Sequence, residues 1–158
     1  MARASAAVDL LAAHADRIGR TAAYDPQWVL DNVSGGAHPL WMTEWLCEAL
    51  ELRPGMRVLD LGCGRASSSI FLRREFGVEV WAVDLWNGPS ENLGRIRAAG
   101  VDDGVFPLKA HARSLPFAAG FFDAIVSVDA QNATEIEAIE ADAGRVLTYV
   151  RAVGRSGA

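Results

Sequence analysis

The hydrophobic pattern along the chain predicts an alternation of strands and helices. Short apolar runs rich in Val, Ile and Leu have the composition of strands buried in a parallel sheet. One run contains Pro107, which cannot donate to a sheet ladder, so we expect that strand at the edge of the sheet. The predicted strands cover residues 57–61, 78–83, 105–110, 122–128 and 145–153.

Helical patterns fill most of the chain between and before these strands. Pro39 suits the first position of a helix, and Gly77 suits the left-handed cap at the end of one. Pro26 and the pair Gly35–Gly36 predict a loop over residues 24–37. The predicted helices cover residues 5–20, 39–50, 67–76, 90–100 and 132–143.

The most informative stretch joins the first strand to the helix after it. Asp60 stands near the end of the strand, and small residues follow it at every second position: Gly62, Gly64 and Ala66. Glycines let the backbone turn tightly and let a ligand lie against it. The amides at the start of the next helix point toward such a ligand. Strand, glycine turn and helix in this order predict a ligand-binding turn.

A second acidic residue fits the same ligand. Asp84 ends the next apolar run, 22 residues after Gly62. Roughly 20 residues is the spacing expected for an acid that binds ribose hydroxyls. A carboxylate suits this task because it can accept two hydrogen bonds from a vicinal diol. The two motifs together predict a nucleoside-binding βαβ unit.

The identity of the nucleoside depends on the residues around the glycines. A dinucleotide fingerprint has Gly or Ala where this chain has Ser67, and it needs no acid at the position of Asp60. An acid beside the turn repels a pyrophosphate and favours a ligand with a cationic group, such as the amino group of a methionine moiety. A nicotinamide-binding fragment remains the weaker alternative.

These motifs resemble those of the class I S-adenosylmethionine-dependent methyltransferases. VLDLGCGRA resembles the family's first motif, VWAVDLW its second, and SLPFAAGFFDAIVSVDA the stretch through its fourth strand. The resemblance covers residues 36–130. It implies an α/β fold with a Rossmann-like doubly wound sheet, S-adenosylmethionine as cofactor and methyl transfer to a small-molecule acceptor. It implies no metal.

The resemblance also implies where the cofactor binds. We expect Arg65 to pair with the methionine carboxylate, although a solvated arginine is as compatible with the sequence. Leu85 and Trp86 are expected to enclose the adenine, and Trp86 could equally be an ordinary aromatic of the core or surface. The predicted cofactor-binding residues are Asp60, Gly62, Cys63, Gly64, Arg65, Ala66, Asp84, Leu85, Trp86, His111, Ala112 and Asp129.

Two histidines require separate comment. His111 stands where the family usually has an acid that accepts from the adenine amino group, and a neutral imidazole accepts less strongly than a carboxylate. The Ala112 amide is expected to contact the ring. His38 lies where such enzymes often place a lid, but a lone histidine is more often structural, so no catalytic residue is identified.

Composition limits the other function classes. The chain has 158 residues, and 15 basic against 20 acidic residues give a net charge of −5, which argues against nucleic acid as a partner. No apolar run reaches the ~20 residues of a membrane span. Cys47 and Cys63 do not suggest a disulfide, so we expect a cytoplasmic protein.

We expect a single methyltransferase-like domain over residues 1–158, in three parts. Residues 1–53 form an N-terminal helical lid, residues 54–130 the cofactor-binding core, and residues 131–158 a C-terminal helix and strand. Compared with the family pattern, the segment with the fifth and sixth strands is missing, which predicts a sheet truncated on one side. A catalytically inactive cofactor-binding module is therefore the main alternative to an enzyme.

The truncation leads to a prediction about assembly. The strand 122–128 is apolar on both faces, and without a fifth strand beside it the strand presents an exposed edge. We expect residues 145–153 to fold back onto this edge or a second molecule to cover it, giving a homodimer or a poorly soluble species with weak methyl transfer. Sedimentation velocity measures this directly, and a well-behaved monomer that turns over a small acceptor would contradict it.

Overall fold

Four parallel strands form the centre of the protein. The computed structural model describes residues 19–33 and 38–128. Within them the sheet has the order β3-β2-β1-β4, with the strands β1 (Arg57–Leu61), β2 (Glu79–Asp84), β3 (Val105–Lys109) and β4 (Ala124–Val126). The predicted α/β fold with a parallel sheet is confirmed, and β3, the strand that contains Pro107, lies at an edge as expected.

Five helical segments belong to the described residues. They are the 3₁₀ helix η2 (Arg20–Ala23) and the α-helices α2 (Pro26–Asp31), α3 (Pro39–Cys47), α4 (Ser67–Phe76) and α5 (Pro89–Ala98). Helix α4 has the predicted bounds, and Gly77 caps it in the left-handed conformation with φ 65°. Strand β4 and helix α3 are shorter than predicted. The predicted helix 5–20, except for its last two residues, and the predicted elements after residue 128 lie outside the described residues.

The predicted loop over residues 24–37 is wrong in part, because Pro26–Asp31 is helical. Pro26 does not interrupt a helix here but occupies the first turn of α2, where a proline costs no hydrogen bond. The side chain of Asp25 caps this turn by accepting from the Trp28 amide at 2.9 Å. Val29 then packs into the core, which stabilises a helix too short to persist alone.

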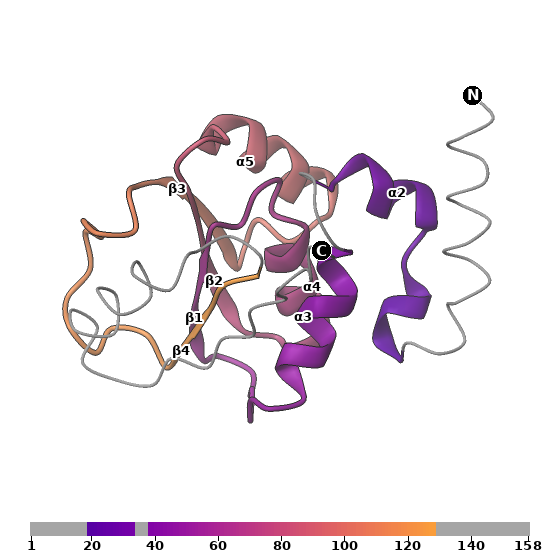
Figure 1. Cartoon of the computed structure of the whole chain (residues 1–158), viewed down its shortest axis with the longest axis horizontal. Coiled ribbons are helices and arrows are strands. Elements are labelled where there is room, and N and C mark those ends of the chain that lie inside the picture. Colours follow the sequence, from indigo (N-terminus) through magenta and orange to yellow (C-terminus); the bar gives the residue numbers. More distant parts are fainter. Residues whose placement is uncertain (1–18, 34–37, 129–158) are drawn as a thin grey trace, which may run out of the picture.

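The two faces of the sheet are covered differently. On one face, side chains such as Val58, Val80 and Ala82 pack against Ile70 of α4 and Ile96 of α5. The other face is covered by the segment that leads into β4. Its side chains Phe117 and Phe122 pack against residues of β1, β2 and β4, namely Leu59, Leu61, Val83 and Ile125. Figure 1 shows α3 and α4 on one side of the sheet and this segment, in orange, on the other.

One carboxylate fastens the N-terminal segment to the body of the domain. Glu44 of α3 accepts hydrogen bonds from the Arg20 amide at 2.6 Å and from the amide and hydroxyl of Thr21 at 2.8 and 2.5 Å. Burial acts to raise the pKa of Glu44, but these hydrogen bonds outweigh it and hold the pKa below its usual value. Tyr24 adds a bond from its hydroxyl to Glu75 of α4 at 3.0 Å.

We expect Glu44→Gln to lower the free energy of unfolding by about 1–2 kcal/mol, because an amide replaces one of the two accepting oxygens. Hydrogen exchange of the Arg20 and Thr21 amides should become faster. Glu48→Gln is the matched control, since Glu48 is exposed at the end of the same helix, and it should change stability by less than about 0.5 kcal/mol. Equal stability of parent and Glu44→Gln would show that the carboxylate does not fasten this segment.

Candidate functional site

The predicted glycine turn lies at the carboxyl end of β1, in the centre of the sheet. The amides of Gly62 and Cys63 both donate to the Val83 carbonyl, at 2.8 and 3.1 Å, so the turn is anchored to β2. Gly62 and Gly64 adopt positive φ angles of 78° and 55°, which a residue with a side chain rarely adopts. The carboxyl edge of a parallel sheet, where its order reverses beside the first strand, is the usual ligand site in such folds.

Ala66 completes the turn under strain. It is the one non-glycine residue with a positive φ (63°) in the described part of the chain, and it directly precedes α4. A left-handed conformation costs a residue with a Cβ about 1–2 kcal/mol. The Ala66 methyl is fully buried in the core between sheet and helices, which offsets part of this cost. The start of α4 is thereby fixed with its first amides directed out of the helix.

Asp84 ties the glycine turn to the loop after β2. One carboxylate oxygen, Oδ2, accepts from the Gly64 amide at 2.9 Å. The other, Oδ1, accepts from the amides of Trp86 and Asn87, both at 2.7 Å. Asp84 is buried, with 7% of its surface exposed. The two predicted motifs therefore meet at this residue.

Asp60 is the second carboxylate of the site, and it is buried. Its Oδ2 accepts from the hydroxyls of Ser68 and Ser69 in the first turn of α4, each at 2.6 Å. Its Oδ1 is buried without a hydrogen-bond partner in the described part of the protein. Burial raises the pKa of Asp60 to about 6, with the charge of Asp84 acting in the same direction and the serine hydroxyls against it. A buried acceptor without a partner is where a cationic ligand group would gain most.

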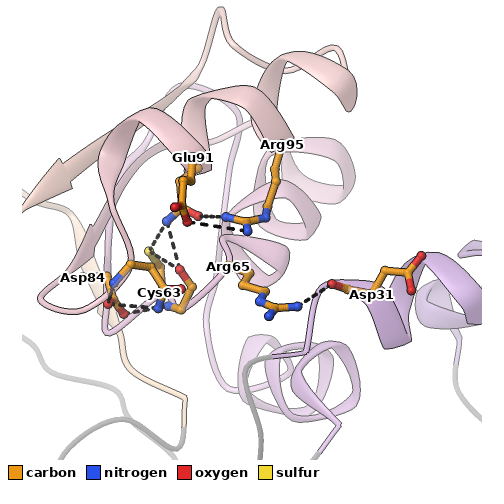
Figure 2. A network of polar contacts seen from close by, with 9 residues as sticks. Asp31, Cys63, Arg65, Asp84, Glu91 and Arg95 are labelled. Atoms are coloured by element: carbon orange, nitrogen blue, oxygen red, sulfur yellow. Dashed lines mark hydrogen bonds and ion pairs between the residues drawn. The ribbon is translucent and has the colours of Figure 1, made fainter.

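The side chains of Arg65 and Cys63 both make contacts within the protein. Arg65 Nη1 donates at 2.9 Å to the carbonyl of Asp31, the last residue of α2, instead of extending from the turn as an unattached cation (Figure 2). The Cys63 thiol is buried in the core, and burial raises its pKa well above the usual range. Only the backbone of Cys63 is therefore available to a ligand.

The predicted adenine-contacting residues flank the turn on the side of β2 and β3. Leu85 and Trp86 follow β2 and are 36% and 87% exposed. Ala110, after β3, donates its amide to the Asp84 carbonyl at 3.3 Å, which brings the next residues beside the site. His111 is exposed, and its Nδ1 accepts from the Arg113 amide at 3.1 Å, so one ring nitrogen is already engaged. Asp129 lies outside the described residues.

Sequence reasoning missed Asn92, which contacts the turn from α5. This side chain is 1% exposed, and its Nδ2 donates to the Gly64 carbonyl at 2.9 Å. Figure 2 shows this region, with Glu91 and Arg95 on the helix above the turn. A signal was present, since Asn92 precedes the fully buried Ile96 by four residues and so lies on the buried face of the helix.

His38 has a structural position. Its Nδ1 accepts from the Trp41 amide at 3.2 Å and caps α3, and its ring stacks on Trp41 at a centroid distance of 4.3 Å. Burial lowers the pKa of His38 to about 4, so the imidazole is neutral at pH 7 and keeps the lone pair that the cap uses. Within residues 19–33 and 38–128, no group of three His, Cys, Asp or Glu side chains could hold a metal, and no helix is long and apolar enough to span a bilayer.

Comparison with known proteins identifies the family of the chain. A family model described as a methyltransferase domain matches residues 58–150, more than half of the chain. The ubiquinone/menaquinone biosynthesis C-methyltransferase UbiE of Vibrio cholerae is 36% identical over 110 residues, which are 66% of this chain and 42% of that protein. Methyltransferase GfsG of Streptomyces halstedii is 35% identical over 89 residues, covering 56% of this chain and 32% of the relative.

Solved structures show the same fold. A geranyl diphosphate methyltransferase superposes with a TM-score of 0.60 and 26% identity, over 68% of this chain and 42% of that one. The [4+2]-cyclase SpnF superposes with a TM-score of 0.55 at 23% identity, over 62% and 37% of the two chains. The chain belongs to the class I S-adenosylmethionine-dependent methyltransferase family. It spans 42% of the length of UbiE and 32% of the length of GfsG.

The buried carboxylate of Asp60 generates a prediction about pH. The folded protein holds this proton up to about pH 6, whereas the unfolded chain releases it near 3.8, so the folded state binds more protons between these values. Stability from this group therefore falls as the pH rises from about 4 to 6. Asp60→Asn should raise the free energy of unfolding by about 1–2 kcal/mol at pH 7 and by little at pH 4.

Urea unfolding at the two pH values measures this effect. Asp102→Asn, at an exposed carboxylate, is the control and should show no such gain. An Asp60→Asn variant that is no more stable than the parent at pH 7 would contradict a buried, charged Asp60.

Proposed function

We propose that the chain binds S-adenosylmethionine and transfers its methyl group to a small-molecule acceptor. The observation that carries this proposal is the pair of carboxylates, Asp60 and Asp84, on either side of the glycine turn at the carboxyl edge of the sheet. Family membership supports the cofactor. The bound cofactor supplies a methyl group already activated on sulfur, so the protein's task is to align donor and acceptor and exclude water.

The proposed roles of the two carboxylates follow from their remaining hydrogen-bonding capacity. Among the described residues, Asp84 Oδ2 accepts one hydrogen bond, from the Gly64 amide, and a carboxylate oxygen can accept about two, so it can bind a ribose hydroxyl. Asp60 Oδ1 has no partner among the described residues, and we assign it to the methionine ammonium group. The burial of both side chains supports strong interactions with a cation or a diol.

The remaining predicted cofactor-binding residues are assigned to the adenine and methionine ends of the cofactor. We assign Leu85, Trp86, His111 and the Ala112 amide to the adenine side. Leu85, Trp86 and His111 are exposed, which leaves them accessible to a ligand. The backbone of residues 62–66 would contact the middle of the cofactor. A role for Arg65 at the methionine carboxylate requires it to exchange or share its contact with the Asp31 carbonyl. Asp129 completes the set as a candidate at the methionine or acceptor end.

The nature of the acceptor is proposed from the relatives' names. UbiE is named as a C-methyltransferase of quinone biosynthesis, and another related structure is named for geranyl diphosphate, both small molecules. A [4+2]-cyclase also has this fold, so the fold alone does not decide the reaction. A cofactor-binding module without catalysis is the alternative, because the chain spans 42% of UbiE.

The compartment is part of the proposal. Both cysteines are free and buried, Cys47 with a pKa raised by burial to about 12 and Cys63 in the glycine turn. Unpaired thiols are typical of reducing compartments, which supports a cytoplasmic protein.

Calorimetry with S-adenosylhomocysteine tests this function, with NADH as the competing nucleoside. We expect binding of the first and none of the second. Asp84→Asn should weaken the binding of S-adenosylhomocysteine by about 1.5–3 kcal/mol, the range for a hydrogen bond to a charged group. Methyl transfer to quinone-like and prenyl diphosphate acceptors then separates an enzyme from a binding module.

Asp123→Asn is the matched control. Asp123 also accepts a backbone amide, that of Arg57 at 2.7 Å, but at the opposite end of the sheet. It should lose a comparable hydrogen bond and keep the parent's affinity. Tighter binding of NADH than of S-adenosylhomocysteine, or equal affinity in parent and Asp84→Asn, would reject the assigned site.

A further inference from the structure

The peptide groups on both sides of Gly64 are held by side chains from two different elements. Its amide donates to Asp84, the last residue of β2, at 2.9 Å, and its carbonyl accepts from Asn92 of α5, at 2.9 Å. Gly64 has a φ of 55° and, without a Cβ, many alternative conformations. External hydrogen bonds are therefore needed to keep the turn in one shape. The amide contact belongs to a residue already assigned to the site, but the carbonyl contact does not.

The orientation of Asn92 is itself fixed. Arg95 Nη1 donates to Asn92 Oδ1 at 2.8 Å, and Arg95 lies 3.9 Å from the Glu91 carboxylate. A guanidinium can only donate, so it selects the oxygen of the amide and directs the NH₂ group to the Gly64 carbonyl. The Asn92 side chain is 1% exposed, so water does not compete for these contacts. The result is a chain of contacts from the surface of α5 to the glycine turn.

We propose that Asn92 is a positioning residue of the cofactor site, which holds the glycine turn in its binding conformation through the Gly64 carbonyl. This inference rests on the proposed function and adds a residue that the sequence motifs do not include. Asn92 need not touch the ligand. It acts by restricting the free turn, so that less conformational entropy is lost when the nucleoside binds. Arg95 acts indirectly, by orienting the side-chain amide of Asn92.

The sharpest variant is Asn92→Asp, which has the same shape and can still accept from Arg95 but no longer donates to the Gly64 carbonyl. We expect its affinity for S-adenosylhomocysteine to fall about tenfold, the loss of one buried hydrogen bond. Arg95→Ala, at a partly exposed residue, should lower the affinity about threefold and is the milder variant if Asn92→Asp folds poorly. Calorimetry measures both.

Two controls on the same helix separate positioning from general stability. Ile96→Val removes a methylene from the core on the same helix and lowers stability without removing a hydrogen bond of the turn. Arg97→Ala removes an exposed cation that pairs with Asp102. Both should bind S-adenosylhomocysteine like the parent. An affinity loss in Ile96→Val as large as that in Asn92→Asp would overturn the proposal, as would parent-like affinity in Asn92→Asp.

Amide hydrogen exchange gives a readout that does not require the ligand. In the free protein, exchange at the Gly64 amide should be about tenfold faster in Asn92→Asp and unchanged in both controls. If the parent chain does not bind S-adenosylhomocysteine, the proposed function fails, and the exchange comparison still decides this inference. Faster exchange then supports the hold of Asn92 on the turn, and equal exchange overturns it.

Discussion

The carboxylate of Asp84 accepts hydrogen bonds from backbone amides of two loops, the glycine turn after β1 and the loop after β2. Neither loop has regular structure to define it, so their relative position depends on this junction. Because β1 and β2 are parallel neighbours, their carboxyl ends come to the same edge, and a short acidic side chain can bridge them. The positions of the Gly64 and Trp86 amides relative to each other follow from this one carboxylate.

The sequence predicted this part of the protein well, because a motif carries its own local geometry. The spacing of Asp60, the glycines and Asp84 specifies a strand, a turn and a helix, and the structure has them at the expected residues. Asn92 was missed because its role depends on which residue of α5 faces the turn, and helix–sheet packing decides that. Helix α2 was not predicted because a proline such as Pro26 is compatible both with the end of a helix and with the first turn of one.

Arg65 illustrates a different limit of sequence reasoning. Its position in the glycine turn was predicted, but its partner is the end of α2, 34 residues earlier in the chain. A carbonyl at the end of a helix carries partial negative charge and attracts a guanidinium as a ligand carboxylate would. Whether Arg65 contacts the helix carbonyl or a ligand depends on tertiary structure, which the residue types in the turn do not predict. Asp60 is comparable, because tertiary structure buries its carboxylate and burial raises its pKa, which the residue type alone does not predict.

The sequence separation of the contacts has a consequence for how the chain folds during synthesis. The bonds that shape the glycine turn join residues 20 to 28 positions apart, from Gly64 to Asp84 and Asn92. The bonds that hold β4 to β1 span 66 positions, from Arg57 to Asp123 and from Leu61 to Ser127. Closing the shorter loops costs less entropy. We therefore expect the nucleoside-binding half to take shape on the ribosome while β4 is still in the exit tunnel, and the sheet to be completed later from an already formed template.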